Sequence, residues 1–497
     1  MINRRYYEIS LIALFFAGIC LGASPVQANM SSISAESQEC IDCHSSINPG
    51  IVADWSSSRH SRITPGEALN KPELERRVSS KDIPDNLRAN VVGCFECHSQ
   101  NESTHKDNFE HFSYQINTIV SPNDCRVCHV EEAEQYGNSK KAEALNILRE
   151  NPLYHTLVET ITSLKTFNKR YIIHGQSSDN AKGESCYACH GTEVKVTGVN
   201  TIDTELGEIE VPKLENWPNQ GVGRINPDGS YGSCAACHPR HSFSIEIARK
   251  PETCSQCHLE PDVPAWNVYR ESKHGNIYNS IGYSWNWDNV PWKPGEDFKA
   301  PTCAVCHNSL LVDSENGIIA NRTHEFGDRL WVRIFGLIYS HPQPKNGKTY
   351  LISNADGIPL PTTFDGQPAR DFLISPDEQA ANNAKMTSVC KTCHGSNWVN
   401  SQFAKFEISL AEADSLVQTA TQIIQNAWDK KLADPANPFD ETIEQMWASQ
   451  WLFYANSIRY ASAMMGPDYA AFKNGWWDAT ENLAKMHDQF LIEQKLK

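Results

Sequence analysis

Three scarcities limit what this chain of 497 residues can be. Of its 17 cysteines, only Cys20 lies outside a Cys-x-x-Cys-His motif, which leaves no thiol pairs for a disulfide framework. Basic side chains number 44 against 60 acidic ones, and this deficit argues against nucleic acid or an anionic membrane surface as a partner. After the N-terminal segment, no run is long and apolar enough to span a bilayer, so we expect no transmembrane span in the mature chain.

What the sequence does have is one motif in eight copies, Cys-x-x-Cys-His. In haem c attachment, the two thiols form thioethers to the porphyrin edge, and the imidazole that follows binds the iron. Zinc sites also use Cys-x-x-Cys pairs, but they need no His after every pair, and only 18 residues of this chain are His. We therefore expect eight covalently bound haem c groups. The paired cysteines are Cys40 and Cys43, Cys94 and Cys97, Cys125 and Cys128, Cys186 and Cys189, Cys234 and Cys237, Cys254 and Cys257, Cys303 and Cys306, and Cys390 and Cys393. The histidines that follow them are His44, His98, His129, His190, His238, His258, His307 and His394.

The N-terminal segment indicates export. Arg4 and Arg5 precede a mostly apolar stretch over residues 9–23, and small residues that suit cleavage follow at 26–28. The stretch is shorter than the roughly 18 residues that a membrane span needs, so it predicts a signal peptide over residues 1–28. We expect the mature protein in the periplasm.

Haem density predicts the fold class. With residues 1–28 removed, eight haems leave roughly 60 residues for each, so the macrocycles must form much of the core. We expect a mainly α multihaem cytochrome c fold with few short strands. An octahaem domain should cover residues 29–395, and a haemless module of long helices should cover residues 396–497 and pack on the haem core or on another subunit.

Periodicity places the regular elements. Alternating apolar residues predict short strands near Val194 and Val196 and near Ile209 and Val211. Three helical segments are predicted after His394, the third from Trp476 to about Lys495. Apolar residues at helical spacing mark the first two, namely Leu416, Ala420, Ile423, Ile424 and Ala427, then Ile443, Met446, Trp447, Trp451, Tyr454, Ile458 and Ala461.

Ten histidines lie outside the motifs. They are His60, His105, His111, His155, His174, His241, His274, His324, His341 and His487. An electron conductor needs a second axial ligand on all eight irons, whereas a chain with one open iron needs seven. The count permits either, so it does not separate a conductor from an enzyme. His241 follows His238 too closely to reach the far face of the same haem, and we expect it to bind a neighbouring iron.

Several stretches between the motifs carry a more specific signal. They are WPNQGVGRINPDGSYGSCAACHPRHSFSIEIARKPETCSQCH (217–258), PGIVADWSSSRHS (49–61), ESKHG (271–275), NRTHEFGDRLW (321–331) and AMMGPDY (463–469). With the number and order of the motifs, they resemble the octahaem c-type cytochromes of the hydroxylamine oxidoreductase family over nearly the whole mature chain. The resemblance implies a homotrimer in which seven haems have two axial ligands and the fourth, on Cys186, Cys189 and His190, is open to substrate.

The resemblance also implies axial ligands. By local motif, the second ligands carry over to His60, His111, His155, His241, His274 and His324. Relatives have a ligand in Ser-Lys-His-Ala after the third motif, where this chain reads Ser139, Lys140, Lys141 and Ala142. Either Lys141 supplies an amine ligand, or His105, His174 or His341 replaces the missing His, or a second iron is exposed.

Catalytic candidates follow from the same resemblance. Asp228 resembles the family's distal carboxylate and would handle protons over the open iron, although Asp-Gly is also ordinary turn chemistry. His174 is a possible second proton group or a ligand. In oxidising members, a tyrosine of a neighbouring subunit is joined to the active haem; Tyr469 is the best candidate here and Tyr460 the next. Either could also be a plain core aromatic.

Three functions remain open from the sequence. The first is oxidation of hydroxylamine or a close relative, with electrons passed to a periplasmic cytochrome or a quinone-linked partner. The second is the reverse direction, with nitrite or hydroxylamine reduced to ammonium. The third is a multihaem conductor without a substrate site.

Overall fold

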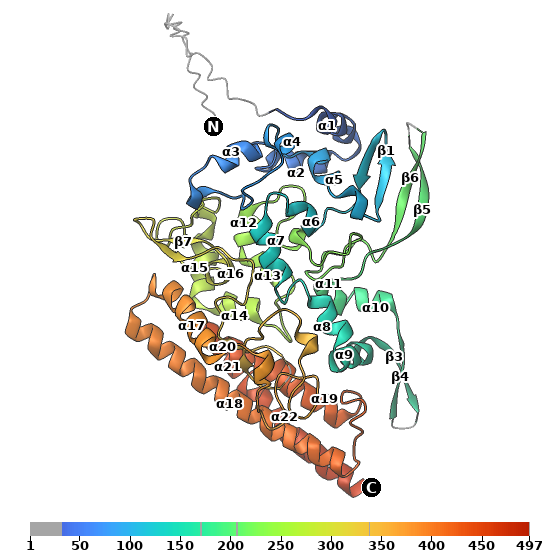
Figure 1. Ribbon diagram of the computed structural model, residues 1–497. Helices are drawn as coiled ribbons and strands as arrows, with labels where there is room; N and C mark the ends of the chain where they lie inside the picture. The colour runs from blue at the N-terminus through green and yellow to red at the C-terminus, as the bar shows by residue number, and fades with distance from the viewer. Residues whose placement is uncertain (1–31, 169–170, 205–206, 337, 497) are drawn as a thin grey trace, which may run out of the picture.

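A computed structural model describes residues 32–168, 171–204, 207–336 and 338–496 of the chain, and the predicted signal peptide lies outside them. Short helices dominate the part that carries the motifs (Figure 1). Its first eleven are α1 (Ala35–Ile47), α2 (Pro49–Ser57), α3 (Pro65–Leu69), α4 (Asp85–Arg88), α5 (Cys94–His98), α6 (Pro122–Cys125), α7 (Val130–Gly137), α8 (Ala144–Glu150), α9 (Pro152–Thr162), α10 (Asp179–Gly183) and α11 (Cys186–His190). The next six are α12 (Ile245–Arg249), α13 (Pro251–Ser255), α14 (Ala265–Glu271), α15 (Lys273–Ile281), α16 (Cys303–His307) and α17 (Pro376–Lys391).

Motifs two, four and seven each form a one-turn helix, α5, α11 and α16. Residues three and four positions apart lie on the same side of a helix. One turn therefore brings both thiols and the imidazole of a motif to one side, which is the arrangement that a single porphyrin requires. Longer helices are unnecessary for attachment, and this accounts for the short elements.

The strands pair only with sequence neighbours in the part of the chain that the structure describes. They make five antiparallel two-stranded sheets. These are β1 (Asn108–His111) with β2 (Tyr114–Asn117), β3 (Ser163–Asn168) with β4 (Tyr171–Ser177), β5 (Lys195–Thr204) with β6 (Gly207–Glu215), β7 (Leu311–Val312) with β8 (Ile318–Ala320), and β9 (Val332–Arg333) with β10 (His341–Pro342). The predicted strands near Val196 and Val211 are the β5–β6 hairpin, in which Asn200 lies opposite Val211. The mainly α class with few short strands is confirmed.

The helices after motif eight, of which α18 and α22 are long, lie together along one edge of the molecule (orange to red in Figure 1). They are α18 (Ser396–Asp429), α19 (Thr442–Ser449), a π-helical turn (Gln450–Tyr454), α20 (Ala455–Met464), α21 (Pro467–Ala471) and α22 (Trp476–Leu496). At 1.5 Å per residue, α18 is about 50 Å long. The three helical segments predicted after His394 are therefore present.

A hydrophobic core holds these helices together. On α18, Val417, Ala420, Ile424 and Ala427 recur every three or four residues and are fully buried. They pack in one cluster with Trp447, Trp451 and Met486 from the helices that follow. No helix in the described part of the chain is long and apolar enough to cross a membrane.

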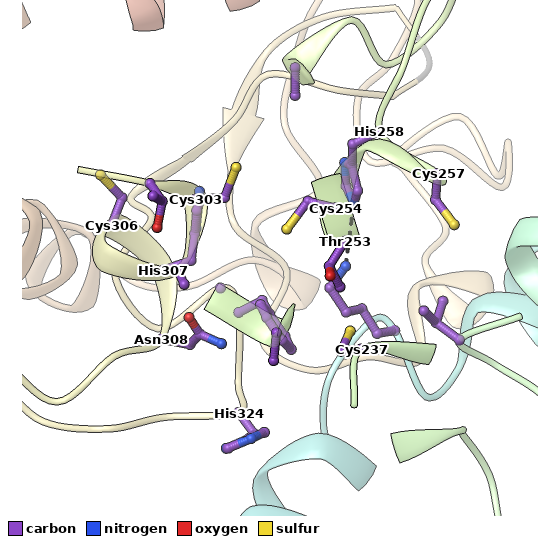
Figure 2. Close-up of a pocket in the computed structure, with 18 of the residues that line it drawn as sticks. Cys237, Thr253, Cys254, Cys257, His258, Cys303, Cys306, His307, Asn308 and His324 are labelled. Carbon is purple, nitrogen blue, oxygen red and sulfur yellow. Dashed lines mark hydrogen bonds between the residues drawn. The ribbon is translucent and has the colours of Figure 1, made fainter. Parts of the chain in front are cut away.

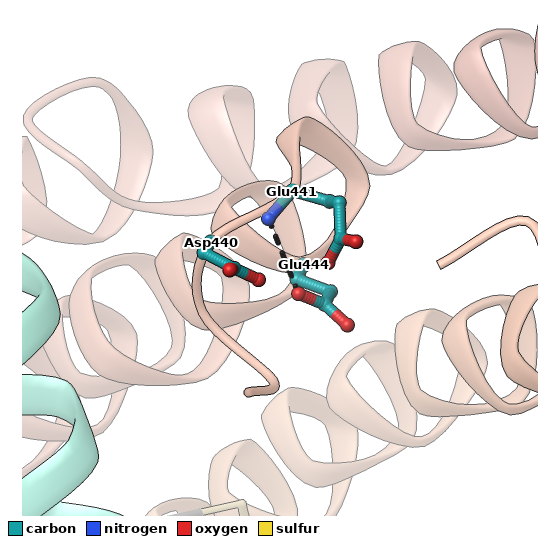
Figure 3. A group of neighbouring side chains, drawn as sticks. All are labelled: Asp440, Glu441 and Glu444. Carbon is teal, nitrogen blue, oxygen red and sulfur yellow. Dashed lines mark hydrogen bonds between the residues drawn. The ribbon is translucent and has the colours of Figure 1, made fainter. Parts of the chain in front are cut away.

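Three carboxyl groups crowd together at the start of α19 (Figure 3). The Trp428 Nε1–H donates to Glu444 Oε1 at 2.7 Å, and the Glu441 backbone N–H donates to Glu444 Oε2 at 3.2 Å. Burial, together with hydrogen bonds to Glu444 and Asp440, raises the pKa of Glu441 to about 9. Near neutral pH, Glu441 therefore stays protonated in the folded protein.

We expect Glu441→Gln to raise the melting temperature at pH 8 and to change it little at pH 4. A carboxyl with a raised folded pKa loses its stabilising contribution as pH rises above its unfolded pKa and through its folded pKa, here from 4.5 to about 9. Glutamine never ionises, so the gain should grow across this window. Thermal unfolding of both proteins between pH 4 and pH 9 measures it, and a gain that is independent of pH would contradict the explanation.

Candidate functional site

A large cavity runs through the part of the molecule that carries the motifs. Its volume is about 2170 Å³, which exceeds the roughly 300–1,000 Å³ of an ordinary ligand pocket. Cysteines from motifs two to eight line it, and apolar side chains make up most of the remaining wall. Figure 2 shows the thiols and imidazoles of motifs six and seven, with His258 and His307, directed into this space. A space of this size and lining suits several macrocycles side by side.

Contacts between thiols give the order of the motifs in space. Four thiol pairs lie close enough for each thiol to shift the pKa of the other, namely Cys40 with Cys94, Cys125 with Cys234, Cys189 with Cys257, and Cys254 with Cys303. Other thiols of different motifs are close enough for their charges to interact, among them Cys97 with Cys128, Cys237 with Cys254, and Cys306 with Cys390. These contacts link motifs one, two, three, five, six, seven and eight in a continuous series. Motif four joins the series as a side branch at motif six.

Four motif histidines each face a second histidine. The ring centres are 6.3 Å apart for His44 and His111, 6.3 Å for His129 and His60, 6.5 Å for His238 and His324, and 6.0 Å for His394 and His274. Two imidazoles that share one metal, each at a bond length of about 2 Å, have ring centres roughly 6 Å apart. The four pairs therefore have the spacing that one iron between the rings requires. The residues fit haem c.

A further pairing is indicated by charge interaction. His241 lies close enough to His98 for a protonated His98 to lower the pKa of His241, after the larger effect of burial. The segment that carries His241 is a turn, not a helix. The turn places His241 beside motif two.

Backbone carbonyls orient the motif histidines. The His190 Nδ1–H donates to the carbonyl of Ala144 at 2.9 Å, and the His98 Nδ1–H donates to that of Asn117 at 2.7 Å. A proton on Nδ1 leaves the lone pair on Nε2, the nitrogen that reaches the iron. The carbonyls thus fix both the tautomer and the ring direction.

Motif four has different surroundings. In the described residues, no second imidazole forms a ring contact with His190, as is also true of His98, His258 and His307. What sets His190 apart is its charged neighbours, since it interacts electrostatically with Asp262, Lys141 and Arg333. Burial raises the pKa of Asp262 and that of Tyr460, and the two groups interact with each other. Asp262, Tyr460 and Arg333 all line the cavity. An acid, a phenol and a guanidinium are therefore gathered near the one motif that is a side branch.

Comparison with known proteins places the chain in a family. Residues 228–321 match a family model described as seven times multi-haem cytochrome CxxCH, and residues 124–210 match cytochrome c554 and c-prime. A solved structure described as a hypothetical multiheme protein is 41% identical, with a TM-score of 0.88, over 94% of this chain and 98% of that one. A probable nitrite reductase-hydroxylamine oxidoreductase fusion protein of Kuenenia stuttgartiensis is 24% identical over 80% of this chain. The chain belongs to the multihaem c-type cytochromes of the hydroxylamine oxidoreductase family.

Two facts limit which properties of these relatives can be inferred for this cytochrome. The chain spans only 38% of the length of the curated Kuenenia relative. A solved reducing HAO-like protein complex of the same organism shares the fold, with a TM-score of 0.60 over 93% of this chain and 86% of that one, at 19% identity. Haem c attachment is thus shown for this cytochrome, whereas its substrate and direction belong to the proposal below.

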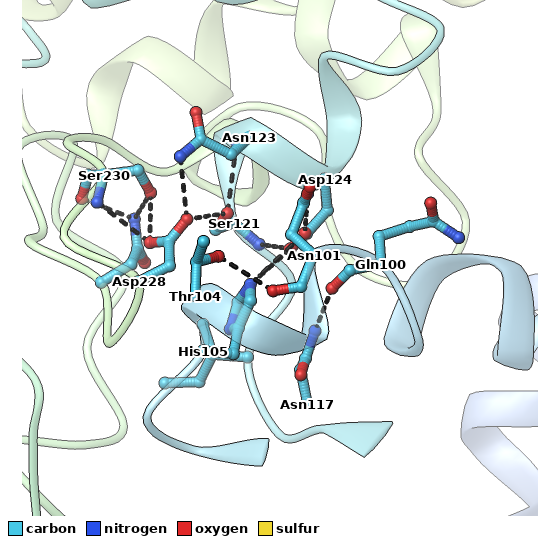
Figure 4. A network of polar contacts seen from close by, with 12 residues as sticks. Gln100, Asn101, Thr104, His105, Asn117, Ser121, Asn123, Asp124, Asp228 and Ser230 are labelled. Atoms are coloured by element: carbon cyan, nitrogen blue, oxygen red, sulfur yellow. Dashed lines mark hydrogen bonds and ion pairs between the residues drawn. The ribbon is translucent and has the colours of Figure 1, made fainter. Parts of the chain in front are cut away.

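Asp228 lies in a polar network outside the lining of the large cavity (Figure 4). Its carboxylate accepts hydrogen bonds from Ser121 Oγ at 2.8 Å, Asn123 Nδ2 at 3.0 Å and the Ser230 backbone N–H at 3.0 Å. Burial alone would raise the pKa of Asp228, but hydrogen bonds from the Ser230 hydroxyl, the Ser230 backbone N–H and the Ser121 hydroxyl lower it. The structure thus gives Asp228 the contacts of a turn residue and does not place it against His190.

His105 occupies the same network and has both ring nitrogens engaged. Its Nδ1 lies 2.9 Å from Asp107 Oδ1, and its Nε2 lies 3.2 Å from Asp124 Oδ2, with all three side chains at most 1% exposed. Burial alone would lower the pKa of His105, yet the two carboxylates raise it to about 10. A histidine held between two carboxylates has no free nitrogen for an iron. His105 therefore does not replace the missing ligand.

The remaining candidates are spread over the molecule. The His174 Nδ1 lies 3.2 Å from Ser163 Oγ in the β3–β4 hairpin. His155 lies 3.9 Å from Glu159 with its side chain 45% exposed. His341 is buried, and its Nδ1–H donates to the carbonyl of Pro342 at 2.7 Å. None of the three is part of the described cavity lining.

Tyr469 is held within its own chain. It is 2% exposed, packs with Val268 and Ala461, and its hydroxyl hydrogen-bonds Glu260. Tyr460, the second candidate from the sequence, is the one that lines the cavity.

Sequence reasoning missed Asp262. It stands four residues after His258, in a short Pro-rich turn that carries no recognisable catalytic motif. The position of Asp262 in the sequence could have identified it as a candidate. A carboxylate that follows a haem motif by only a few residues stays close to a macrocycle, whatever direction the chain takes.

We expect His105→Gln to destabilise the protein by about 3–5 kcal/mol at neutral pH, because two buried carboxylates lose their cation. The stabilisation should be full below the unfolded pKa near 6.5 and should disappear as pH rises through about 10. Denaturant unfolding measures the change, with His487→Gln on the exposed side of α22 as the control. The haem absorption spectrum should stay the same, and loss of a low-spin haem signal would show instead that His105 is a ligand.

Proposed function

We propose that this cytochrome is an oxidoreductase for small nitrogen compounds and that the fourth motif carries the reacting haem. The observation that carries the proposal is the setting of His190, a side branch of the thiol series with Asp262 and Tyr460 gathered near it. A haem attached there would supply an open coordination position and exchange electrons with a small ligand. The seven motifs of the series would conduct those electrons.

The reductive direction has the better support. The resemblance to the family links oxidation to a tyrosine joined to the active haem, and the best candidate, Tyr469, has its hydroxyl hydrogen-bonded to Glu260 inside its own chain. Asp262 supplies the second argument, since its raised pKa favours the protonated carboxyl that a reduction can draw on. The relative named as a reducing complex has the same fold.

Hydroxylamine is the simplest substrate for this site. Its reduction takes two electrons and two protons, breaks the N–O bond and yields ammonia and water. Asp262 would deliver a proton to the leaving hydroxyl, and the Arg333 guanidinium would favour an anionic substrate such as nitrite.

Electrons would enter or leave at the ends of the series. Cys43 of motif one and Cys393 of motif eight are the exposed motif cysteines in the described chain. A periplasmic cytochrome or a quinone-linked partner would exchange electrons at one of these ends. We further propose export to the periplasm and a homotrimer with one reacting haem in each subunit.

The test is an anoxic assay of the purified holoprotein with a reduced viologen dye. We expect hydroxylamine-dependent oxidation of the dye with ammonium as the product. Hydroxylamine-dependent reduction of an added electron acceptor, without ammonium, would establish the oxidative direction instead. A holoprotein in which every iron is six-coordinate and binds no added ligand would leave only the conductor.

We expect Asp262→Asn to lower kcat for hydroxylamine by about 10²-fold or more, because the amide cannot donate the carboxyl proton. The haem count and the reduced absorption spectrum should remain those of the parent. Asp228→Asn is the informative comparison, since the sequence favours Asp228 as the proton-handling group and our proposal gives that role to Asp262. A larger loss in Asp228→Asn would reverse the assignment.

A further inference from the structure

One amine occupies the position that a second imidazole takes at other motifs. Lys141 lies in the turn between α7 and α8, and its Nζ is 3.3 Å from Nε2 of His258. Nε2 is the nitrogen that binds iron in a Cys-x-x-Cys-His motif. His258 itself is directed into the cavity beside Cys254 and Cys257 (Figure 2).

The distance suits coordination through a shared metal. Two metal–nitrogen bonds of about 2 Å place the nitrogens about 4 Å apart. The observed separation is close to that value, and the flexible four-carbon stem of a lysine can provide the remaining displacement. A direct hydrogen bond from Nζ to Nε2 would occupy the lone pair that the attached haem needs, so it is not compatible with a loaded motif six.

The surroundings of Lys141 favour coordination over an ordinary ion pair. Its Nζ lies 4.8 Å from the centre of the Phe326 ring, and Lys141 lines the large cavity. The charge of Lys141 interacts with that of Glu325, but in the described part of the chain Lys141 Nζ forms no ion pair with a carboxylate within 4 Å. Three imidazoles interact with the charge of Lys141, namely His258, His307 and His190, and all three belong to motifs. Of these, only His258 has a ring nitrogen within hydrogen-bond distance of Nζ.

The turn that carries Lys141 also serves motif four. The carbonyl of Ala144, three residues on, accepts the Nδ1–H of His190, and the Ala144 N–H donates to the carbonyl of Lys141 at 3.2 Å. Motifs four and six are also in thiol contact through Cys189 and Cys257. One short turn therefore orients the imidazole of motif four and presents an amine to motif six.

We propose that the Lys141 amine is the sixth ligand of the haem on Cys254, Cys257 and His258. This haem is then ligated by one imidazole and one amine, and no histidine has to replace the one missing at position 141. An alkyl amine is a σ-donor without π-acceptor orbitals, so it favours ferric iron more than an imidazole does. The proposal concerns coordination alone and is independent of the substrate or direction proposed above.

The test uses the ferric holoprotein and two spectroscopic readouts, electron paramagnetic resonance and the near-infrared charge-transfer band of low-spin haem. We expect one haem equivalent with a histidine–amine signature. Lys141→His should convert that equivalent to a bis-histidine signature, and Lys141→Ala should convert it to a haem that is high-spin and binds added imidazole. Lys140→Ala removes the neighbouring lysine and should leave the histidine–amine signature in place.

Covalent haem content, counted by mass spectrometry for each variant, separates a ligand effect from a failure to mature. A variant with the full haem content is scored by spectroscopy. Absence of a histidine–amine component in the parent protein would overturn the proposal, as would a Lys141→Ala variant that keeps the same number of low-spin haems. If Lys141→Ala incorporates too little haem, Lys141→His tests the proposal instead. The proposal requires that the histidine–amine signature of the parent protein is absent from Lys141→His.

Discussion

Attachment of each macrocycle at two thiols and one imidazole is the constraint on which the rest of this structure depends. A one-turn helix is enough to present those three groups, and α5, α11 and α16 are each such a turn. The chain between the motifs then has only to line the space that the haems occupy. A cavity of about 2170 Å³ would not persist in a close-packed protein interior without contents, so the haems are structural as well as chemical components. The long helices differ, because α18 to α22 form an ordinary aliphatic and aromatic core of their own.

The connection between motifs four and six makes the order of the motifs in space asymmetric. Thiol contacts link seven motifs in one series and leave motif four on a branch. The turn between α7 and α8 contacts both motifs at this branch. The carbonyl of Ala144 accepts a hydrogen bond from His190 of motif four, and Lys141 Nζ lies beside Nε2 of His258 in motif six. A change in this turn would therefore affect the orientation of one imidazole and the coordination of the neighbouring iron together.

Sequence reasoning predicted the elements whose pattern is local. The helices after His394 and the β5–β6 hairpin follow from periodicity, since each pattern repeats within one element. His60, His111, His274 and His324 were chosen by local motif, and each ring faces a motif histidine in the structure. Asp228 and Asp262 show the limit. Both are carboxylates in turns close to a motif in sequence, and only the path of the chain determines that Asp262 approaches His190 while Asp228 bonds Ser121 and Asn123.

By itself, the sequence determined the covalent chemistry, because two cysteines and a histidine within one helical turn suffice to bind a haem. It also determined that the chain is mainly helical. The tertiary structure decided which side chain opposes each motif, as with His274 and His394 or Lys141 and His258. The physical reason is that axial coordination needs two nitrogens on opposite faces of one flat macrocycle, and the second must come from a segment far away in sequence, where packing alone sets the distance.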